Sequence, residues 1–344
     1  VRLWGDFPVI TTVADDITSE NIDEVYPQYF PKQNTELEAY QQIEKDLLDA
    51  VLYAPDNTPG NKTLFTKSVA RTLLAKIYAE KPLRDYTKVI QYCDEVKADG
   101  FDLVDDFSDL FGMNAAGTDA KMRNTKESIL EAQFTSGAGN WCTWMFGRDL
   151  VNWNNNFTWA KWVTPSRDLI SAFKQEGDEV RFKESIVYYD CNWSNYYPSD
   201  NYPFMYKCRS ANSSIIKYRY ADVLLLKAEA LIMQDTPDLE GAADIIDKVR
   251  DRAKLGALPT SVRSNKNAML NALLKERRLE LAFEGQRWFD LVRLDKVEEV
   301  MNAVYAKDSG RKAQIYTFDK NSYRLPIPQS VIDANDKIHQ NPGY

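Results

Sequence analysis

The stretch Lys275–Arg293, which reads KERRLELAFEGQRWFDLVR, decides how the rest of the chain is interpreted. Apolar residues recur at helical spacing over about 267–283, Gly285 interrupts this pattern, and helical spacing then resumes to about 306. The spacing predicts a long helix, a break and further helical pieces. Arg277 and Glu280 stand three residues apart on the long helix, so we expect these two side chains to pair.

Three large rings, Phe283, Trp288 and Phe289, flank the break, and we expect them to bury a large apolar area there. The stretch is also dense in charge, which raises the question of catalysis. However, Glu-rich helices usually present solvated faces, and no spacing among the 51 Asp and Glu residues singles out a glycosidase-like pair. The stretch therefore indicates a fold signature and not an active site.

Helical hairpins are predicted on both sides of the chain's centre. Thr35 and Glu38 have capping-box spacing and open a first long helix. Two helix pairs then resemble tetratricopeptide hairpins, 66–80 with 83–98 and 218–234 with the helix that follows Pro237. Because such repeats need neighbours to bury their outer faces, we expect their mates to lie in an absent N-terminal segment or to be degenerate.

Between the two pairs, residues from about 134 to 206 are rich in Trp, Tyr, Asn, Ser and Gly. One helix is predicted there, with Thr164 as its N-cap and Pro165 at its first position. The remainder is expected to form irregular loops on a rigid helical frame, where binding sites concentrate.

Aromatic residues make up 12% of the chain, and most of its eight Trp fall in this middle region. Sugars present flat C–H faces edged by hydroxyls, so exposed rings flanked by amides suit them. The predicted ligand-binding residues are Trp141, Trp144, Trp153, Trp159, Trp193, Tyr196, Tyr202 and Asn154. The alternative is that these rings only attach an irregular region to the helices.

Composition and the remaining motifs narrow the class of protein. The 344 residues carry a net charge of −8, which argues against a nucleic-acid binder, and no apolar run of eighteen residues occurs. No nucleotide-binding motif or zinc-type cysteine spacing is present, so we predict no catalytic residue, no metal and no cofactor. The acidic group Asp102, Asp105 and Asp106 does not follow the EF-hand pattern for calcium.

The few cysteines and the single histidine are not arranged for catalysis. Cys93 lies at an apolar helical position and is expected to be a buried thiol. Cys191 and Cys208 flank a loop-like stretch and are candidates for a disulfide in an oxidising compartment. His339 is expected to be an exposed tail residue, because a lone histidine cannot assemble a triad.

Several of these stretches are similar to the SusD/RagB family of Bacteroidetes. Lys275–Arg293 resembles the C-terminal hallmark of that family, and we refer to it as the hallmark segment. Tyr218–Leu225 resembles the helix that precedes the hallmark, Pro165–Arg181 a mid-chain segment, and Pro326–Ser330 with the closing Asn341–Tyr344 the family's ending.

The resemblance implies a mostly α fold, in which tetratricopeptide-like helical hairpins form a scaffold with a large loop-rich, Trp-rich insertion. We expect a single SusD-like domain over 1–344. Its predicted parts are a helical scaffold (35–100), a loop-rich ligand-binding region (101–217), a helical scaffold with the hallmark (218–306) and an extended tail (307–344).

The resemblance also implies a function. It predicts a non-catalytic, cell-surface glycan-binding protein that delivers oligo- or polysaccharide to a SusC-like TonB-dependent transporter. A RagB-like peptide-binding uptake protein is the first alternative, and a glycoside hydrolase is the second. The implied location is the outer membrane, with a lipid anchor in the full precursor; we expect the anchor and the first helices to be absent from this chain.

Overall fold

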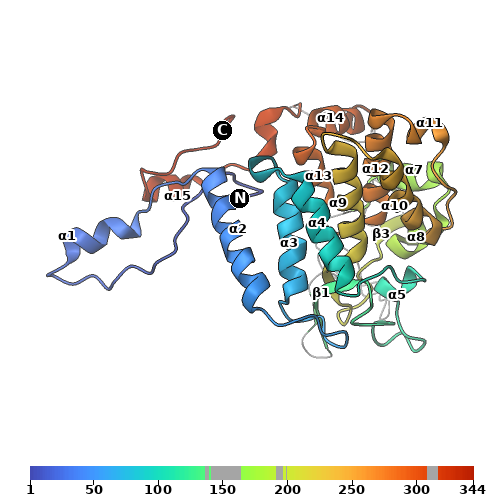
Figure 1. The fold of residues 1–344 in the computed structure, drawn as a ribbon, viewed down its shortest axis with the longest axis horizontal. Helices are drawn as coiled ribbons and strands as arrows, with labels where there is room; N and C mark the ends of the chain where they lie inside the picture. The colour runs from blue at the N-terminus through green and yellow to red at the C-terminus, as the bar shows by residue number, and fades with distance from the viewer. Residues whose placement is uncertain (136–138, 141–163, 191–196, 199, 308–316) are drawn as a thin grey trace.

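The computed structural model in Figure 1 describes residues 1–135, 139–140, 164–190, 197–198, 200–307 and 317–344. The fold is mostly α, as predicted. The α-helices are α1 Ile22–Val25, α2 Glu36–Tyr53, α3 Lys67–Ala79, α4 Tyr86–Ala98, α5 Ser108–Phe111, α7 Arg167–Glu176, α8 Glu179–Ser185, α9 Tyr220–Met233, α10 Leu239–Arg252, α11 Thr260–Arg263, α12 Lys266–Glu280, α13 Arg287–Arg293, α14 Val297–Lys307 and α15 Gln329–Ala334. The strands are β1 Ser128–Ala132, β2 Ile186–Tyr189, β3 Tyr202–Met205 and β4 Ile215–Arg219, and the 3-10 turns are Tyr26–Tyr29, Lys81–Leu83 and Lys320–Tyr323.

The two predicted hairpins, α3–α4 and α9–α10, pack directly on each other through α4 and α9 (Figure 1). Their shared core is close-packed around Leu74, Val89, Leu225 and Ile246, each of which is fully buried, as is the small Ala75. Helix α2 covers the outer side of α3, and α12 covers α9 and α10. The two sequence-distant hairpins are thus each other's neighbours. The expected mates in an absent N-terminal segment, or degenerate ones, stay a prediction.

Of the two N-caps predicted from the sequence, the one that begins α2 is confirmed and the one that begins α7 is wrong. The capping box is confirmed: the Thr35 hydroxyl accepts from the Glu38 N–H at 3.2 Å, and the Glu38 carboxylate accepts from the Thr35 N–H at 2.8 Å. The predicted cap at Thr164 is wrong. Ser166 caps α7 by accepting the Leu169 N–H at 3.1 Å, while the Thr164 hydroxyl lies 2.7 Å from the Tyr202 hydroxyl.

The middle region is more regular than predicted. Besides α7, its described part contains α8 and the antiparallel pair β2–β3, in which Ile186 faces Met205 and Tyr189 faces Tyr202. A second antiparallel pair, β1–β4, joins the middle region to α9. Parts of the predicted extended tail are also helical, because α15 and a 3-10 turn lie within it.

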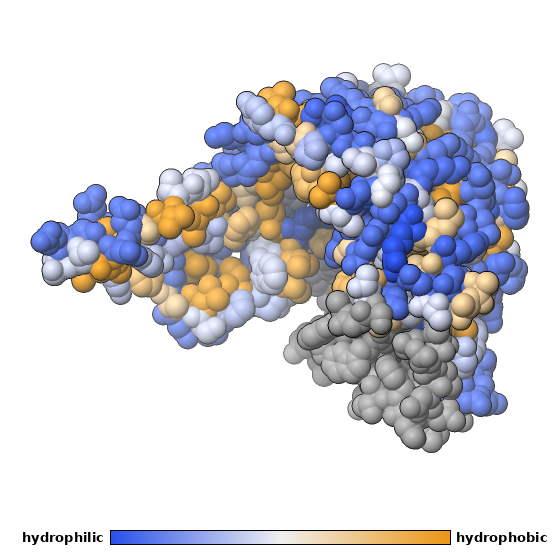
Figure 2. Space-filling view, turned by 90° about the horizontal axis from the view of Figure 1, so that it is seen from below, coloured by the Kyte–Doolittle hydropathy of each residue, from blue (hydrophilic) through white to orange (hydrophobic). Residues whose placement is uncertain are grey.

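The two ends of the chain run side by side as an arm that projects from the helical body (Figure 1). Hydrogen bonds join the two ends: the Leu325 N–H donates to the Leu3 carbonyl at 2.7 Å, and the Asn335 side chain donates to the Pro31 carbonyl at 2.8 Å. Hydrophobic side chains are visible along the arm in Figure 2. Its exposed large apolar residues include Trp4, Ile10, Val13, Ile17, Ile22, Tyr26 and Tyr29. No helix in the described ranges has the length and apolarity needed to span a membrane.

Candidate functional site

Most of the ligand-binding residues predicted from the sequence fall outside the described residues, and their role stays a prediction. These residues are Trp141, Trp144, Trp153, Asn154, Trp159, Trp193 and Tyr196. The eighth, Tyr202, lies in β3 with only 3% of its surface exposed. Its ring packs edge-on to Tyr197 at 5.6 Å and against Phe204 at 4.9 Å, so its burial favours a packing role over the predicted exposed one.

An open cleft of about 460 Å³ lies beside this aromatic cluster, between α7, β2 and the loop that leads into β3. One wall comes from α7, and two tyrosines stand opposite it. The lining residues are Arg167, Ile170, Ser171, Lys174, Gln175, Tyr188, Tyr197, Pro198 and Asn201. Aromatic faces next to hydroxyl, amide and cationic groups can both stack on a ligand and hydrogen-bond to it.

The tyrosines of the cleft are held by defined contacts. The Tyr197 hydroxyl donates to the Pro165 carbonyl at 2.7 Å, and the Arg167 guanidinium lies 5.4 Å from the Tyr197 ring centre. Tyr188 packs against Phe182 at 6.4 Å, and partial burial raises the pKa of its hydroxyl. The phenol therefore stays protonated at neutral pH and can donate a hydrogen bond.

The cleft residues were only partly accessible to sequence reasoning. The predicted site residues belong mainly to the Trp cluster and do not include Tyr188, because Tyr188 lies in a strand where the composition predicts an irregular loop. The run Ile186–Tyr189, IVYY, carries a β-branched and aromatic signal that favours a strand and was the available clue.

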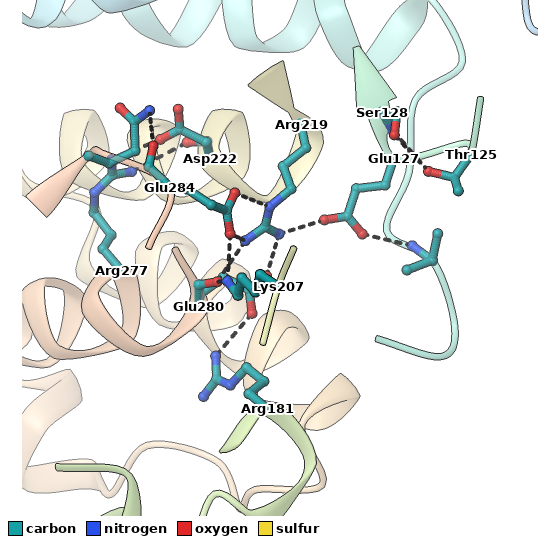
Figure 3. Close-up of polar contacts among 12 residues, drawn as sticks. Thr125, Glu127, Ser128, Arg181, Lys207, Arg219, Asp222, Arg277, Glu280 and Glu284 are labelled. Carbon is teal, nitrogen blue, oxygen red and sulfur yellow. Dashed lines mark hydrogen bonds and ion pairs between the residues drawn. The ribbon is translucent and has the colours of Figure 1, made fainter. Parts of the chain in front are cut away.

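The interior holds a contrasting arrangement, a buried network of arginines and carboxylates centred on Glu280. We call it the arginine network; its residues are Glu127, Asp178, Arg181, Lys207, Arg219, Arg252, Glu276, Glu280 and Glu284. Figure 3 shows Arg219 between Glu127, Glu280 and Glu284. Arg219 donates to Glu127 at 2.7 Å and to both oxygens of Glu284 at 2.7 and 2.8 Å.

The network links elements far apart in the sequence. Glu127 immediately precedes β1 and Arg219 ends β4, so the antiparallel pairing brings both side chains to α12. Arg181 from α8 reaches Glu280 at 3.1 Å and Asp178 at 2.6 Å, and Arg252 from α10 also pairs with Glu280. Four segments are thereby fixed to one helix by charge-assisted hydrogen bonds.

The electrostatics of the network favour the charged form of its central carboxylate, Glu280. Burial alone raises the pKa of Glu280, but Arg252, Arg219 and Arg181 outweigh burial and hold that pKa well below its ordinary value. Burial lowers the pKa of Lys207 to about 8, partly offset by Glu284, to which it donates at 2.6 Å. Glu276 and Glu280 are buried and Glu284 is half-buried, which corrects the expected solvated face.

The predicted pairing of Arg277 with Glu280 is wrong. Arg277 instead donates to Asp222 at 2.8 Å and to Asp290 at 2.9 Å. Nearby, the buried Arg293 donates to Glu229 at 2.7 Å. Burial raises the pKa of Asp222, yet Lys76 and Arg277 lower it overall. Arg277 pairs with residues distant in the sequence and not with Glu280, because a fully buried carboxylate needs several well-placed donors.

The other titratable candidates from the sequence have ordinary structural roles. Cys93 is buried, and burial raises the pKa of its thiol, as expected for a packed residue; His339 is exposed. Asp102, Asp105 and Asp106 each pair with a lysine. No metal-binding group of three or more His, Cys, Asp or Glu side chains occurs in the described ranges. Cys191 lies outside those ranges, so its pairing with Cys208 stays a prediction.

The fold and the cleft together define a class: a scaffold of stacked α-hairpins, locked by buried ion pairs, that carries an open aromatic cleft at one side. Comparison with known proteins narrows this class. The model of the SusD family matches residues 197–344. SusD-like protein P2 of Formosa agariphila is 28% identical, with 100% of this chain and 71% of that protein covered.

Solved structures share the fold along the whole chain. A laminarin-binding SusD-like protein superposes with a TM-score of 0.71 at 23% identity, covering 100% of this chain and 75% of the other. Surface glycan-binding protein A from Bacteroides thetaiotaomicron, in complex with laminarihexaose, gives 0.73 at 19% identity, covering 99% and 74%. The family model, the curated relative and the solved structures support a SusD-like family member, as the resemblance of the hallmark segment predicts.

Proposed function

We propose that this protein is a cell-surface glycan-binding protein that captures oligo- or polysaccharide and delivers it to a SusC-like TonB-dependent transporter. The observation that carries the proposal is the open cleft with Tyr188 and Tyr197, whose lining residues belong to 167–201, part of the Trp- and Tyr-rich stretch of the sequence. Two proteins of the same fold bind laminarin or laminarihexaose, and this supports glycan as the ligand class.

The mechanism is capture without covalent chemistry. Rings in the cleft would stack on the C–H faces of sugars, while Gln175, Asn201 and the tyrosine hydroxyls would bond to the sugar hydroxyls. Binding should be modest for each sugar, because exposed stacking and hydroxyl contacts compete with water. The buried, paired state of the hallmark carboxylates supports a structural role for them and thus a non-catalytic protein.

The location and the transporter partner rest on the family. Family membership supports placement at the outer membrane through a lipid anchor in the full precursor, where the captured glycan would pass to the transporter. The predicted Trp141, Trp153 and Trp193 would add further stacking surfaces to those of the cleft.

Calorimetry against laminarin, laminarihexaose, a panel of other oligosaccharides and a panel of oligopeptides tests the proposal. Wild-type protein should bind at least one glycan, and Trp141→Ala, Trp153→Ala and Trp193→Ala should weaken it. Tyr53→Ala is the control, because this ring is 84% exposed on α2, an element that contributes nothing to the cleft lining. Peptide binding without glycan binding would favour the RagB-like alternative, and release of sugar products would favour a hydrolase.

A further inference from the structure

A second pocket, separate from the cleft, lies where the hallmark segment meets α14. Its volume is about 390 Å³, at the lower end of the range for small-molecule sites and too small for a polymer. Most of its lining is apolar, with Phe283 and Trp288 from the hallmark segment and Met301 and Val304 from α14. All four side chains are half-buried, so their apolar surfaces are accessible from the pocket.

One lining residue, Arg287, differs from the other arginines of the hallmark segment. Arg277 pairs with Asp222 and Asp290, Arg278 with Asp168, and Arg293 with Glu229 and Asp290. Arg287, in contrast, makes one described hydrogen bond, from Nη1 to the Leu274 carbonyl at 2.9 Å, and has no carboxylate partner among the described residues.

The surroundings of Arg287 make this cation costly. The side chain is half-buried, and burial together with the nearby Arg278 lowers its pKa to about 10, a value at which it still carries a charge at neutral pH. The nearby Asp290 and Asp168 raise the pKa of Arg287 but do not outweigh burial. A cation in an apolar pocket with no carboxylate bonded to it is destabilising unless an anion compensates it. Arg277 and Arg278 also line the pocket, but each is paired with a carboxylate, so Arg287 is the lining arginine that remains to bind an anion.

We propose that this pocket binds a small amphiphilic anion, a carboxylate attached to an aromatic or branched apolar body. Arg287 would donate to the carboxylate, and Phe283, Trp288, Met301 and Val304 would contact the apolar body. The site is independent of the glycan cleft, since no residue lines both. A free sugar is disfavoured as the occupant because the lining offers few hydroxyl or amide partners.

Three probes test the two halves of the proposal on the full chain by calorimetry: 4-phenylbutyrate, the neutral 4-phenyl-1-butanol, and acetate. We expect 4-phenylbutyrate to bind about tenfold more tightly than the alcohol, because a charge-assisted hydrogen bond adds to the same apolar contact. Acetate should bind most weakly. Equal affinity for acid and alcohol, or no binding of either, would overturn the proposal.

Variants locate the site. Arg287→Gln should remove the preference for the acid and leave the affinity for the alcohol unchanged, whereas Arg263→Gln, at a surface arginine outside the pocket, should preserve both. Val304→Trp should fill the pocket and weaken both ligands without touching Arg287. In methionine-methyl NMR, 4-phenylbutyrate should shift the Met301 resonance, assigned through Met301→Leu. An undisturbed Met301 resonance during saturable binding would place the ligand elsewhere and reject the proposal.

Discussion

The arginine network and the tyrosine cleft use charged and aromatic side chains in opposite ways. In the network, Arg219 and Glu280 are almost completely buried, and each meets several partners within the protein. In the cleft, Tyr188 and Lys174 keep surface open to solvent. The network therefore contributes to the fold, while the cleft keeps exposed the groups that the proposed glycan binding needs. The density of charge in a sequence does not distinguish a structural from a binding role. The two roles are distinguished by whether the charged and aromatic side chains find partners within the protein.

The strongest way to break this comparison is to remove one network carboxylate. Glu280→Gln leaves Arg181, Arg219 and Arg252 without their shared anion, so we expect a loss of about 3–5 kcal/mol in the free energy of unfolding. Urea denaturation measures this loss. Glycan affinity of the folded protein should be unchanged. A loss below about 1 kcal/mol would mean that the network is dispensable to the fold.

Acid should weaken the scaffold before it affects the cleft. Glu280, Glu284, Asp222 and Asp290 have pKa values below their ordinary ones, so the unfolded chain binds protons more readily than the folded protein. Their stabilisation is complete above the unfolded pKa of about 4 and is lost as the pH falls from there towards the folded pKa.

Thermal melts from pH 7 to pH 3 measure this dependence. The melting temperature should be nearly constant down to about pH 5 and then fall, with a shallower fall in Glu280→Gln. Glycan affinity should be the same at pH 7 and pH 5, because tyrosine phenols do not titrate there. A melting temperature that rises on acidification would contradict the assigned direction of the pKa shifts.

The sequence predicted the scaffold well and the network poorly, for a physical reason. Helical periodicity and the Thr35 cap depend on residues close in the sequence, so the helices and the hairpins were accessible. The partners of Arg277 and Glu280 come from α8, β4, α9, α10 and α13, and a local spacing rule selected the wrong pair. Ion-pair partners are decided by tertiary packing, which one sequence does not display.

The cleft lies in the region where the sequence predicts a binding face, but its lining contains none of the predicted site residues. Clustered Trp and Tyr indicated an aromatic binding face in the middle of the chain, and the cleft lies within that region. However, the β2–β3 pairing buries Tyr202 and leaves Tyr188 at the cleft, and which ring of a strand faces outward depends on register. Register could not be determined where the sequence was interpreted as irregular.

A change in the cleft should have the complementary effect to Glu280→Gln. Tyr188→Leu keeps apolar volume but removes the flat ring, so we expect glycan affinity to fall roughly 3- to 10-fold, as for the loss of one stacking contact. The free energy of unfolding should change much less than in Glu280→Gln. Calorimetry with the glycan that binds the wild type measures the affinity, with Tyr53→Ala as the exposed-ring control. An unchanged affinity would remove Tyr188 from the binding site.

The smallest effect is expected at an ion pair that joins the same scaffold from its surface. Lys227 of α9 binds Asp94 of α4 at 2.6 Å, bridging the two hairpins, but the Asp94 side chain is 50% exposed. Water already solvates this carboxylate, so Asp94→Asn should cost less than about 1 kcal/mol of unfolding free energy. Urea denaturation of Asp94→Asn and Glu280→Gln compares their losses in unfolding free energy. Both carboxylates bridge helices through basic partners, so the main difference between the two sites is burial. Equal losses in the two variants would show that connecting the helices, and not excluding water, makes a charge important to this fold.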